Sequence, residues 1–268
     1  MDCRNRNRLF ANVLHLIIGA ALLSSVQTTC DIVMDDIRMH ITSPHLLSAY
    51  RSATLNASNP THSKISTNLF AITQANKRLI WKTIDGEDYV LVVNLAEDDR
   101  KYLGNPVKVL DSIVWITVVP ELIELCANYL IENPHANISD IGLRLSQSLG
   151  LPGINIGYTL IEFWVRPKDL FRPCPDPEID DDRCDLSFPA NVPEEHREWI
   201  NSLRATTYAD AYKGIEYGGY PWTQLGYTYD WRPETTNNVG PSEYVIKKGS
   251  KVYVNKIYNL IEYCRNGK

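Results

Sequence analysis

The run Tyr89–Leu95 (YVLVVNL) sets the expected fold class, because it is apolar at nearly every position and has the length of a strand. Two further runs of this kind cover Ile113–Val119 (IVWITVV) and Tyr158–Val165 (YTLIEFWV). Continuous rather than alternating apolarity is typical of strands whose two faces are both covered. These runs therefore predict a sheet that is buried between two layers.

Helical patterns surround these strands. Pro120 can open one helix, Ser139 is a candidate N-cap for a second that ends at Leu149, and Pro193 precedes an acidic first turn that favours a third. Strands and helices occur without a regular βα alternation. The sequence therefore predicts an α+β fold: a single domain with a mixed or antiparallel sheet that is flanked by helices and stapled by disulfides.

Residues 1–29 have the order of a secretory signal peptide. Three arginines precede the apolar run Val13–Leu23, and small and polar residues follow it. A short buried or interfacial helix is the alternative. We expect an exported protein, secreted, periplasmic or on the cell surface, with no transmembrane segment in the mature chain. Cys30 is a possible lipid anchor, although cleavage by ordinary signal peptidase fits equally well.

After the signal peptide, we expect a polar N-terminal segment over 30–80 and a globular domain over 81–268. The polar segment contains a short helix that begins near Ser43-Pro44, followed by a loop.

The chain has 268 residues, of which 44% are hydrophobic and 22% charged, which excludes a membrane bundle and a disordered chain. Its net charge of -5 gives no basic surplus for binding nucleic acid.

Four cysteines remain after Cys3 and Cys30 are set aside, an even number in a chain expected in an oxidising compartment. Three pairings are possible, and we favour Cys174 with Cys184 and Cys126 with Cys264. Reduced core thiols are the alternative. No CxxC motif or close His-Cys set indicates zinc, and no dinucleotide or P-loop motif indicates a cofactor. We therefore expect neither a metal nor a cofactor.

The segment 208–231 is the most unusual part of the chain, because eight of its residues are aromatic and glycines lie between them. Glycine lets a loop bend tightly, and Tyr and Trp offer flat faces with a polar tip. Such a loop could stack on a ligand, or its aromatic residues could pack inward over a core edge. The candidate ligand-binding residues are Tyr220, Trp222, Thr223, Tyr227, Tyr229, Trp231 and Arg232.

Carboxylates in unusual positions are candidate catalytic groups. Glu162 interrupts an apolar run, where it is either a functional carboxylate or a paired or edge residue, and Asp230 lies in the aromatic segment. Five acidic residues lie between Cys174 and Cys184, and a sixth, Asp185, follows directly. That loop lacks the glycine of a calcium-binding EF-hand turn, so we expect it to be solvated rather than to hold calcium.

The tail Ser242–Val254 has an acidic residue, an apolar strand, a Gly249 turn and a second strand. It resembles the closing hairpin of arginine-type ADP-ribosyltransferases, and Glu243 would fall at the catalytic Glu of that family. Pro241 stands where the family has its first Glu or Gln. The resemblance implies that Glu243 would bond the nicotinamide ribose and that NAD would be a substrate. An ordinary hairpin with an exposed Glu is the alternative.

These observations support two hypotheses. The first is an exported binding or interaction module that takes a small-molecule, glycan or protein ligand on the aromatic segment. The second is a secreted enzyme that cleaves a glycosidic bond, in a glycan or in NAD, with carboxylates among Glu243, Glu162 and Asp230.

Overall fold

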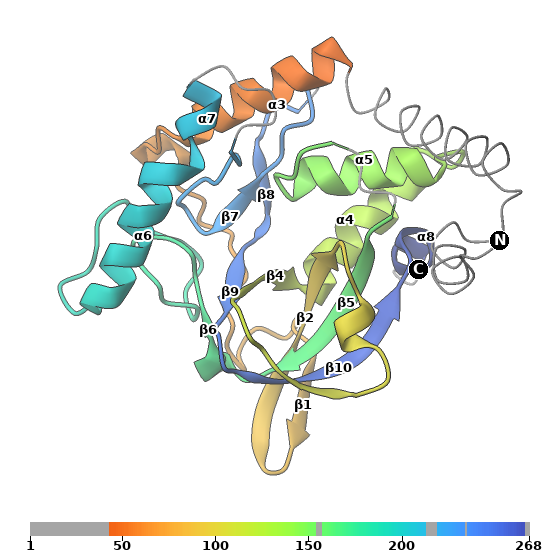
Figure 1. Cartoon of the computed structure of the whole chain (residues 1–268), viewed down its shortest axis with the longest axis vertical. Coiled ribbons are helices and arrows are strands. Elements are labelled where there is room, and N and C mark those ends of the chain that lie inside the picture. Colours follow the sequence, from red (N-terminus) through yellow and green to blue (C-terminus); the bar gives the residue numbers. More distant parts are fainter. Residues whose placement is uncertain (1–42, 154–156, 213–218, 234, 266–268) are drawn as a thin grey trace, which may run out of the picture. The chain divides into compact units, whose positions relative to one another are not determined.

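The computed structural model describes residues 43–153, 157–212, 219–233 and 235–265 (Figure 1). The fold described below belongs to the compact unit His45–Lys268. The expected signal peptide and Cys30 lie outside the described residues. Within the described part of the chain, no helix is both long enough and apolar enough to cross a membrane.

The centre of the fold is an eight-stranded sheet in which every neighbouring pair is antiparallel. Its order is β3-β10-β5-β2-β4-β9-β6, and β1 pairs with the first part of β2. A separate ribbon joins β7 to β8. The strands are β1 (Trp81–Ile84), β2 (Glu87–Ala96), β3 (Val107–Val109), β4 (Val114–Val118), β5 (Thr159–Val165), β6 (Leu170–Phe171), β7 (Tyr227–Tyr229), β8 (Val239–Ser242), β9 (Tyr244–Ile246) and β10 (Lys251–Tyr258).

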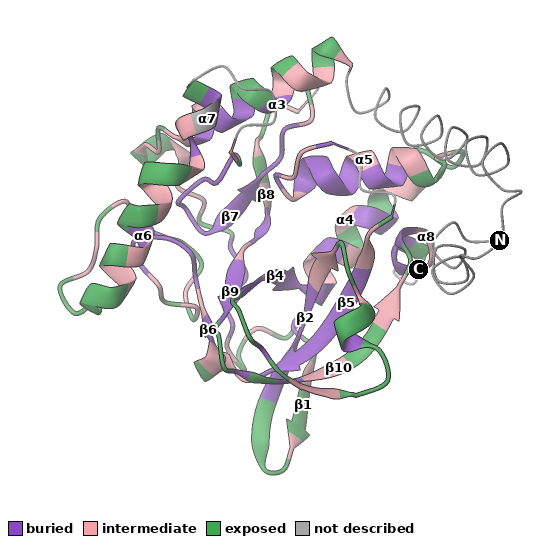
Figure 2. Ribbon diagram, viewed as in Figure 1, coloured by how far each residue is buried: buried purple, intermediate pink, exposed green. Residues whose placement is uncertain are grey.

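Both faces of the central strands are buried, as the continuous apolar runs predict (Figure 2). Val90 and Val92 of β2 face one core, and Leu91 and Val93 face the other. Strand β5 alternates in the same way because side chains along a strand point to opposite faces. The α+β fold with an antiparallel sheet is therefore confirmed.

One face of the sheet is covered by helices. Helices α4 (Val119–Glu132), α5 (Ile138–Ser148) and α8 (Leu260–Arg265) supply apolar residues to the core that contains Leu91 and Val93 (Figure 1). The other core is completed by residues of 70–79 and 102–110. The remaining elements are α3 (Pro44–Ala57), α6 (Glu194–Thr207), the one-turn α7 (Ala209–Tyr212) and three short 3₁₀ helices, His62–Lys64, Arg100–Tyr102 and Pro167–Asp169.

The residues predicted to start the helices do so in α4 and α6, whereas α5 begins differently. Pro120 lies in the first turn of α4, and Pro193 is the N-cap of α6. The N-cap of α5 is Asn137 rather than the predicted Ser139. The Asn137 side chain accepts the backbone N–H groups of Ser139 and Asp140, and the Asp140 carboxylate accepts the Asn137 N–H, which completes a capping box.

The predicted C-terminal hairpin is wrong. β9 lies between β4 and β6, so both of its edges are occupied, whereas β10 pairs with β3 and β5. The Gly249 turn itself forms, with φ 82°. There the Gly249 N–H donates to the Leu110 carbonyl at 2.8 Å, which directs the following strand toward β3.

Two disulfides join Cys126 to Cys264 and Cys174 to Cys184, which confirms the favoured pairing. The first links α4 to α8 on the helical face of the sheet, and its cysteines are 138 positions apart in the sequence. The second closes a loop of 10 residues.

Removing either bridge should destabilise the fold, and the cost should be greater for the bridge that closes the longer loop. In the chain-entropy model, the Cys126→Ala/Cys264→Ala variant loses about 5 kcal/mol of unfolding free energy, and the Cys174→Ala/Cys184→Ala variant loses about 3 kcal/mol. Urea unfolding of both variants beside the oxidised wild type measures the difference. A larger loss in the short-loop variant would contradict the assigned role of the long bridge.

Candidate functional site

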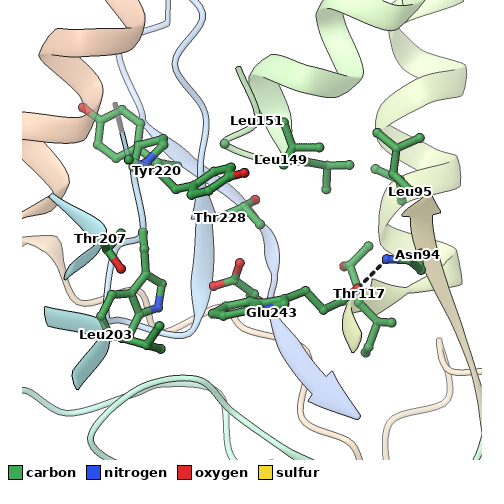
Figure 3. Close-up of a pocket in the computed structure, with 18 of the residues that line it drawn as sticks. Asn94, Leu95, Thr117, Leu149, Leu151, Leu203, Thr207, Tyr220, Thr228 and Glu243 are labelled. Carbon is green, nitrogen blue, oxygen red and sulfur yellow. Dashed lines mark hydrogen bonds between the residues drawn. The ribbon is translucent and has the colours of Figure 1, made fainter. Parts of the chain in front are cut away.

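A pocket of about 650 Å³ lies between the central sheet, the helices and the aromatic segment (Figure 3). Strands β2 and β4, the end of α5, the end of α6 and the segment 219–222 form its walls. The pocket is lined by Val93, Asn94, Leu95, Trp115, Ile116, Thr117, Leu122, Leu149, Gly150, Leu151, Leu203, Thr206, Thr207, Gly219, Tyr220, Pro221, Trp222, Thr228, Tyr229 and Glu243.

Glu243 occupies the point where two strands stop pairing. Ile116 of β4 pairs with Tyr244 of β9, so the next position in register would join Thr117 to Glu243. β9 begins only at Tyr244, so Glu243 lies just outside the ladder. In Figure 3 its carboxyl group lies between the wall with Leu203 and the wall with Thr117.

One oxygen of the Glu243 carboxyl group is buried without a polar partner, although the residue as a whole is half-buried. Its Oε2 atom is buried and accepts no hydrogen bond from any residue that the structure describes. Burial raises the pKa of Glu243 from 4.5 to about 8, since the apolar surroundings disfavour the charged form. The side chain is therefore mainly protonated at neutral pH.

Neighbouring backbone contacts fix the position of Glu243. Its N–H donates to the Gly226 carbonyl at 2.9 Å. The adjacent Ser242 donates its N–H to Glu121 Oε2 at 2.9 Å, and its hydroxyl contacts Glu121 Oε1 at 3.3 Å. Burial raises the pKa of Glu121 to about 7, although the two Ser242 hydrogen bonds oppose the shift. The sequence analysis missed Glu121, which anchors the bend between β8 and β9.

Two further polar groups of the pocket come from the apolar strands. Thr117 Oγ1 is buried, and no described residue is within hydrogen-bonding distance of it. Asn94 donates from Nδ2 to the Trp115 carbonyl at 2.8 Å, which holds the amide on the wall (Figure 3). The sequence analysis missed both residues. Their signal was the same as that of Glu162, a polar residue within an apolar run.

The aromatic segment divides between the pocket and the core. Of the candidate ligand-binding residues, Tyr220, Trp222 and Tyr229 line the pocket. Tyr220 is 53% exposed, whereas Trp222 and Tyr229 are buried. Part of the segment therefore packs inward, which was the alternative reading, and part forms a wall. Residues 213–218 of the segment, Tyr217 included, lie outside the described residues.

The other candidates from this segment are not among the lining residues. Tyr227 and Trp231 belong to two separate buried clusters, and their polar tips donate to backbone carbonyls. The Thr223 hydroxyl donates to the Tyr227 carbonyl at 2.6 Å and accepts the Leu225 N–H, so it shapes a turn. Arg232 lies beside this region, and its N–H donates to Asp230 Oδ1 at 3.1 Å.

Glu162 lies in the same row of the sheet as Glu243 but is not part of the pocket lining. In register, Glu162 is opposite Val93, and Val93 is opposite Thr117. Three strand spacings, about 14 Å, therefore separate the backbones of the two glutamates. Glu162 Oε2 accepts from Asn255 Nδ2 at 2.6 Å, and burial raises its pKa.

Asp230 forms a buried ion pair outside the pocket. Its two oxygens accept from Arg144 Nη1 at 3.0 Å and Nη2 at 2.6 Å, and both side chains are buried. The pair joins α5 to the end of the β7 segment. Such bidentate contacts orient both groups, which points to a structural role for this carboxylate.

Replacing Asp230 should therefore lower stability. Asp230→Asn leaves the Arg144 guanidinium buried without its counter-charge, which costs about 3–5 kcal/mol of unfolding free energy. The double variant Arg144→Met/Asp230→Leu removes both charges and should recover most of that loss. Urea unfolding measures both variants. An Asp230→Asn variant as stable as the wild type would contradict the structural role.

In the part of the chain that the structure describes, one group of acidic side chains lies close enough to share a metal ion: Asp176, Glu178 and Asp181. None of them lines the pocket.

Comparison of the chain with models of protein families, with curated proteins and with solved structures finds no match. The assignment of function therefore depends on the geometry of the pocket.

Proposed function

We propose that the protein is a binding module whose pocket takes a compact, largely apolar organic cation, with Glu243 as the counter-ion. The observation that carries this proposal is the carboxyl group of Glu243, whose buried Oε2 atom has no partner within the described part of the chain. No Lys, Arg or His occurs among the described residues that line the pocket. A positively charged ligand would supply the missing partner.

The size of the pocket supports a small ligand. Its volume of about 650 Å³ falls in the range of about 300–1,000 Å³ that is typical of small-molecule sites. Most of the wall is apolar or aromatic, which stabilises the body of a ligand by burial and leaves orientation to a few polar groups.

The polar groups of the wall favour a ligand that donates hydrogen bonds. Because Asn94 Nδ2 already donates to a backbone carbonyl, its Oδ1 atom is the group that can accept from a ligand. Thr228 Oγ1 is engaged with the Ser148 carbonyl at 2.6 Å. With the carboxyl of Glu243, the wall is therefore rich in acceptors. Trp115 and Trp222 also line the pocket, and aromatic rings attract cations electrostatically.

Binding of a cation is linked to the protonation of Glu243. At pH 7 the carboxyl is mainly neutral, because burial raises its pKa to about 8. An ammonium group favours the ionised carboxylate, so binding releases a proton. Affinity therefore rises with pH up to about 8 and then levels off, as long as the ligand stays protonated.

The matched probes monodansylcadaverine, a primary ammonium ion, and its neutral N-acetyl derivative test this proposal. We expect the cationic probe to bind the wild type at least about tenfold more tightly at pH 8, because only it can pair with the carboxylate. Glu243→Gln should remove that preference and the rise of affinity with pH. Fluorescence titration measures each affinity.

Tyr220→Ala is the control for the aromatic wall, since it keeps the carboxyl and the preference for the cation. Equal affinity of the wild type for both probes would contradict the proposal. Tighter binding of the neutral probe, with affinity that falls above pH 8, would mean that protonated Glu243 donates to a neutral ligand instead.

Cleavage of a glycosidic bond is a second candidate, which the protonated state of Glu243 at neutral pH favours, because a general acid needs a raised pKa. Glycosidases of the common type use two carboxyl groups at most about 9.5 Å apart. Glu243 is the single carboxylate among the described lining residues. We therefore place binding ahead of catalysis.

A further inference from the structure

The loop between Cys174 and Cys184 is held in place along its length. The disulfide closes it, and the Arg172 N–H donates to the Pro177 carbonyl at 3.0 Å. The segment 69–72 also binds the loop, because Leu69 N–H donates to Asp182 O at 2.9 Å and Ile72 N–H donates to Ile179 O at 2.6 Å. The acidic side chains of this loop are therefore carried on a fixed backbone.

One of these acidic side chains is buried rather than solvated. Asp176 is 8% exposed, and its Oδ1 atom is buried with no hydrogen-bond partner among the described residues. The expectation of a fully solvated acidic loop is therefore wrong at this residue. The burial of Asp176 follows from the closed loop, since both cysteines that flank it are fully buried.

The carboxyl group of Asp176 lies in a cluster of three carboxylates. Asp176, Glu178 and Asp181 each offer an oxygen, and these oxygens all lie within 4.8 Å of one another. Arg172 is fully buried and donates from Nη1 to Asp181 Oδ1 and from Nη2 to the Asp181 carbonyl. One guanidinium balances one of the three negative charges, so a charge of about two remains unbalanced at neutral pH.

The crowding of these carboxyl groups raises the pKa of two of them. Burial, with the negative charge of Asp181, raises the pKa of Asp176. The negative charge of Asp176 is the main cause that raises the pKa of Glu178.

We propose that Asp176, Glu178 and Asp181 form a calcium site on the disulfide loop. Ca²⁺ binds oxygen at about 2.3–2.6 Å, so two of its ligands can be as far apart as about 4.6–5.2 Å. The spacing of up to 4.8 Å therefore suits Ca²⁺ with the loop as it stands. Mg²⁺ binds oxygen at about 2.0–2.1 Å, allows at most about 4.2 Å between two ligands and therefore tolerates less of this range of spacings than Ca²⁺ does.

The charge of the site fits a divalent ion, since three carboxylates and Arg172 leave about two negative charges. Ca²⁺ takes six to eight oxygen ligands, so water completes the shell beyond the three side chains. Glu178 is exposed and Asp181 is half-buried, which leaves an open side for these waters and for entry of the ion. The site lies apart from the pocket of Glu243, so this inference is independent of the proposed function.

Calorimetric titration of the full chain, oxidised and freed of metal by a chelator, with CaCl₂ tests the site. We expect one Ca²⁺ per chain with a Kd between about 10⁻⁵ and 10⁻³ M, and weaker binding of Mg²⁺. Asp176→Asn keeps the shape of the side chain and should weaken Ca²⁺ binding at least about tenfold. Glu178→Gln changes an exposed residue and provides a second variant that should fold normally.

Asp182→Asn is the matched control, because it removes one charge from an exposed residue of the same loop that is outside the cluster. It should bind Ca²⁺ within about twofold of the wild type, since it provides no ligand. No saturable binding by the wild type would overturn the proposal. Equal weakening in the control and in Glu178→Gln would also overturn it, because the effect would then be one of general charge.

Discussion

Strands β2 and β5 pair from Val90 opposite Val165 to Ala96 opposite Thr159, and both faces of this pair are buried. Burial of two faces requires two covering layers, which α4, α5 and α8 form on one side and the segments 70–79 and 102–110 on the other. The Cys126–Cys264 bridge then holds two of the helices together. The rest of the fold is arranged around this double-sided core.

The pocket lies beside the end of the β4–β9 ladder. β4 continues past its last pair with β9, which joins Ile116 to Tyr244. Thr117 and Glu243 therefore lie just beyond the β4–β9 ladder, and both line the pocket. Each has a buried oxygen without a partner within the described residues. An unsatisfied buried polar group costs about 1–3 kcal/mol, so such a pair at one pocket is a reason to expect that a ligand completes it.

Local patterns in the sequence predicted the central strands and several helices, but they did not predict which strands pair. The apolar runs gave the central strands because burial of both faces leaves a continuous signal, and prolines marked the starts of α4 and α6. The prediction of a hairpin in the tail was wrong. The turn at Gly249 depends on local sequence, whereas the partners of β9 and β10 are strands far away in the chain.

The candidate site was predictable only in part. Glu243 was singled out because the tail resembles a family whose catalytic Glu precedes a hairpin. In the structure, its position depends instead on where the β4–β9 ladder ends. Asn94 and Thr117 were visible as polar interruptions of apolar runs. The division of the aromatic segment between pocket and core depends on tertiary packing, which composition does not encode. Burial of Asp176 was likewise hidden, because its acidic neighbours favour a solvated loop.

The most direct test of the account is the pKa of Glu243 in the ligand-free protein. Carbon-13 NMR of the labelled glutamate carboxyl groups, with the Glu243→Gln variant to assign the resonance, follows the titration of this one side chain. The account predicts a midpoint near the value of about 8 that burial produces. A midpoint near the ordinary value of 4.5 would mean that the carboxyl is solvated or paired, and it would contradict the proposed counter-ion.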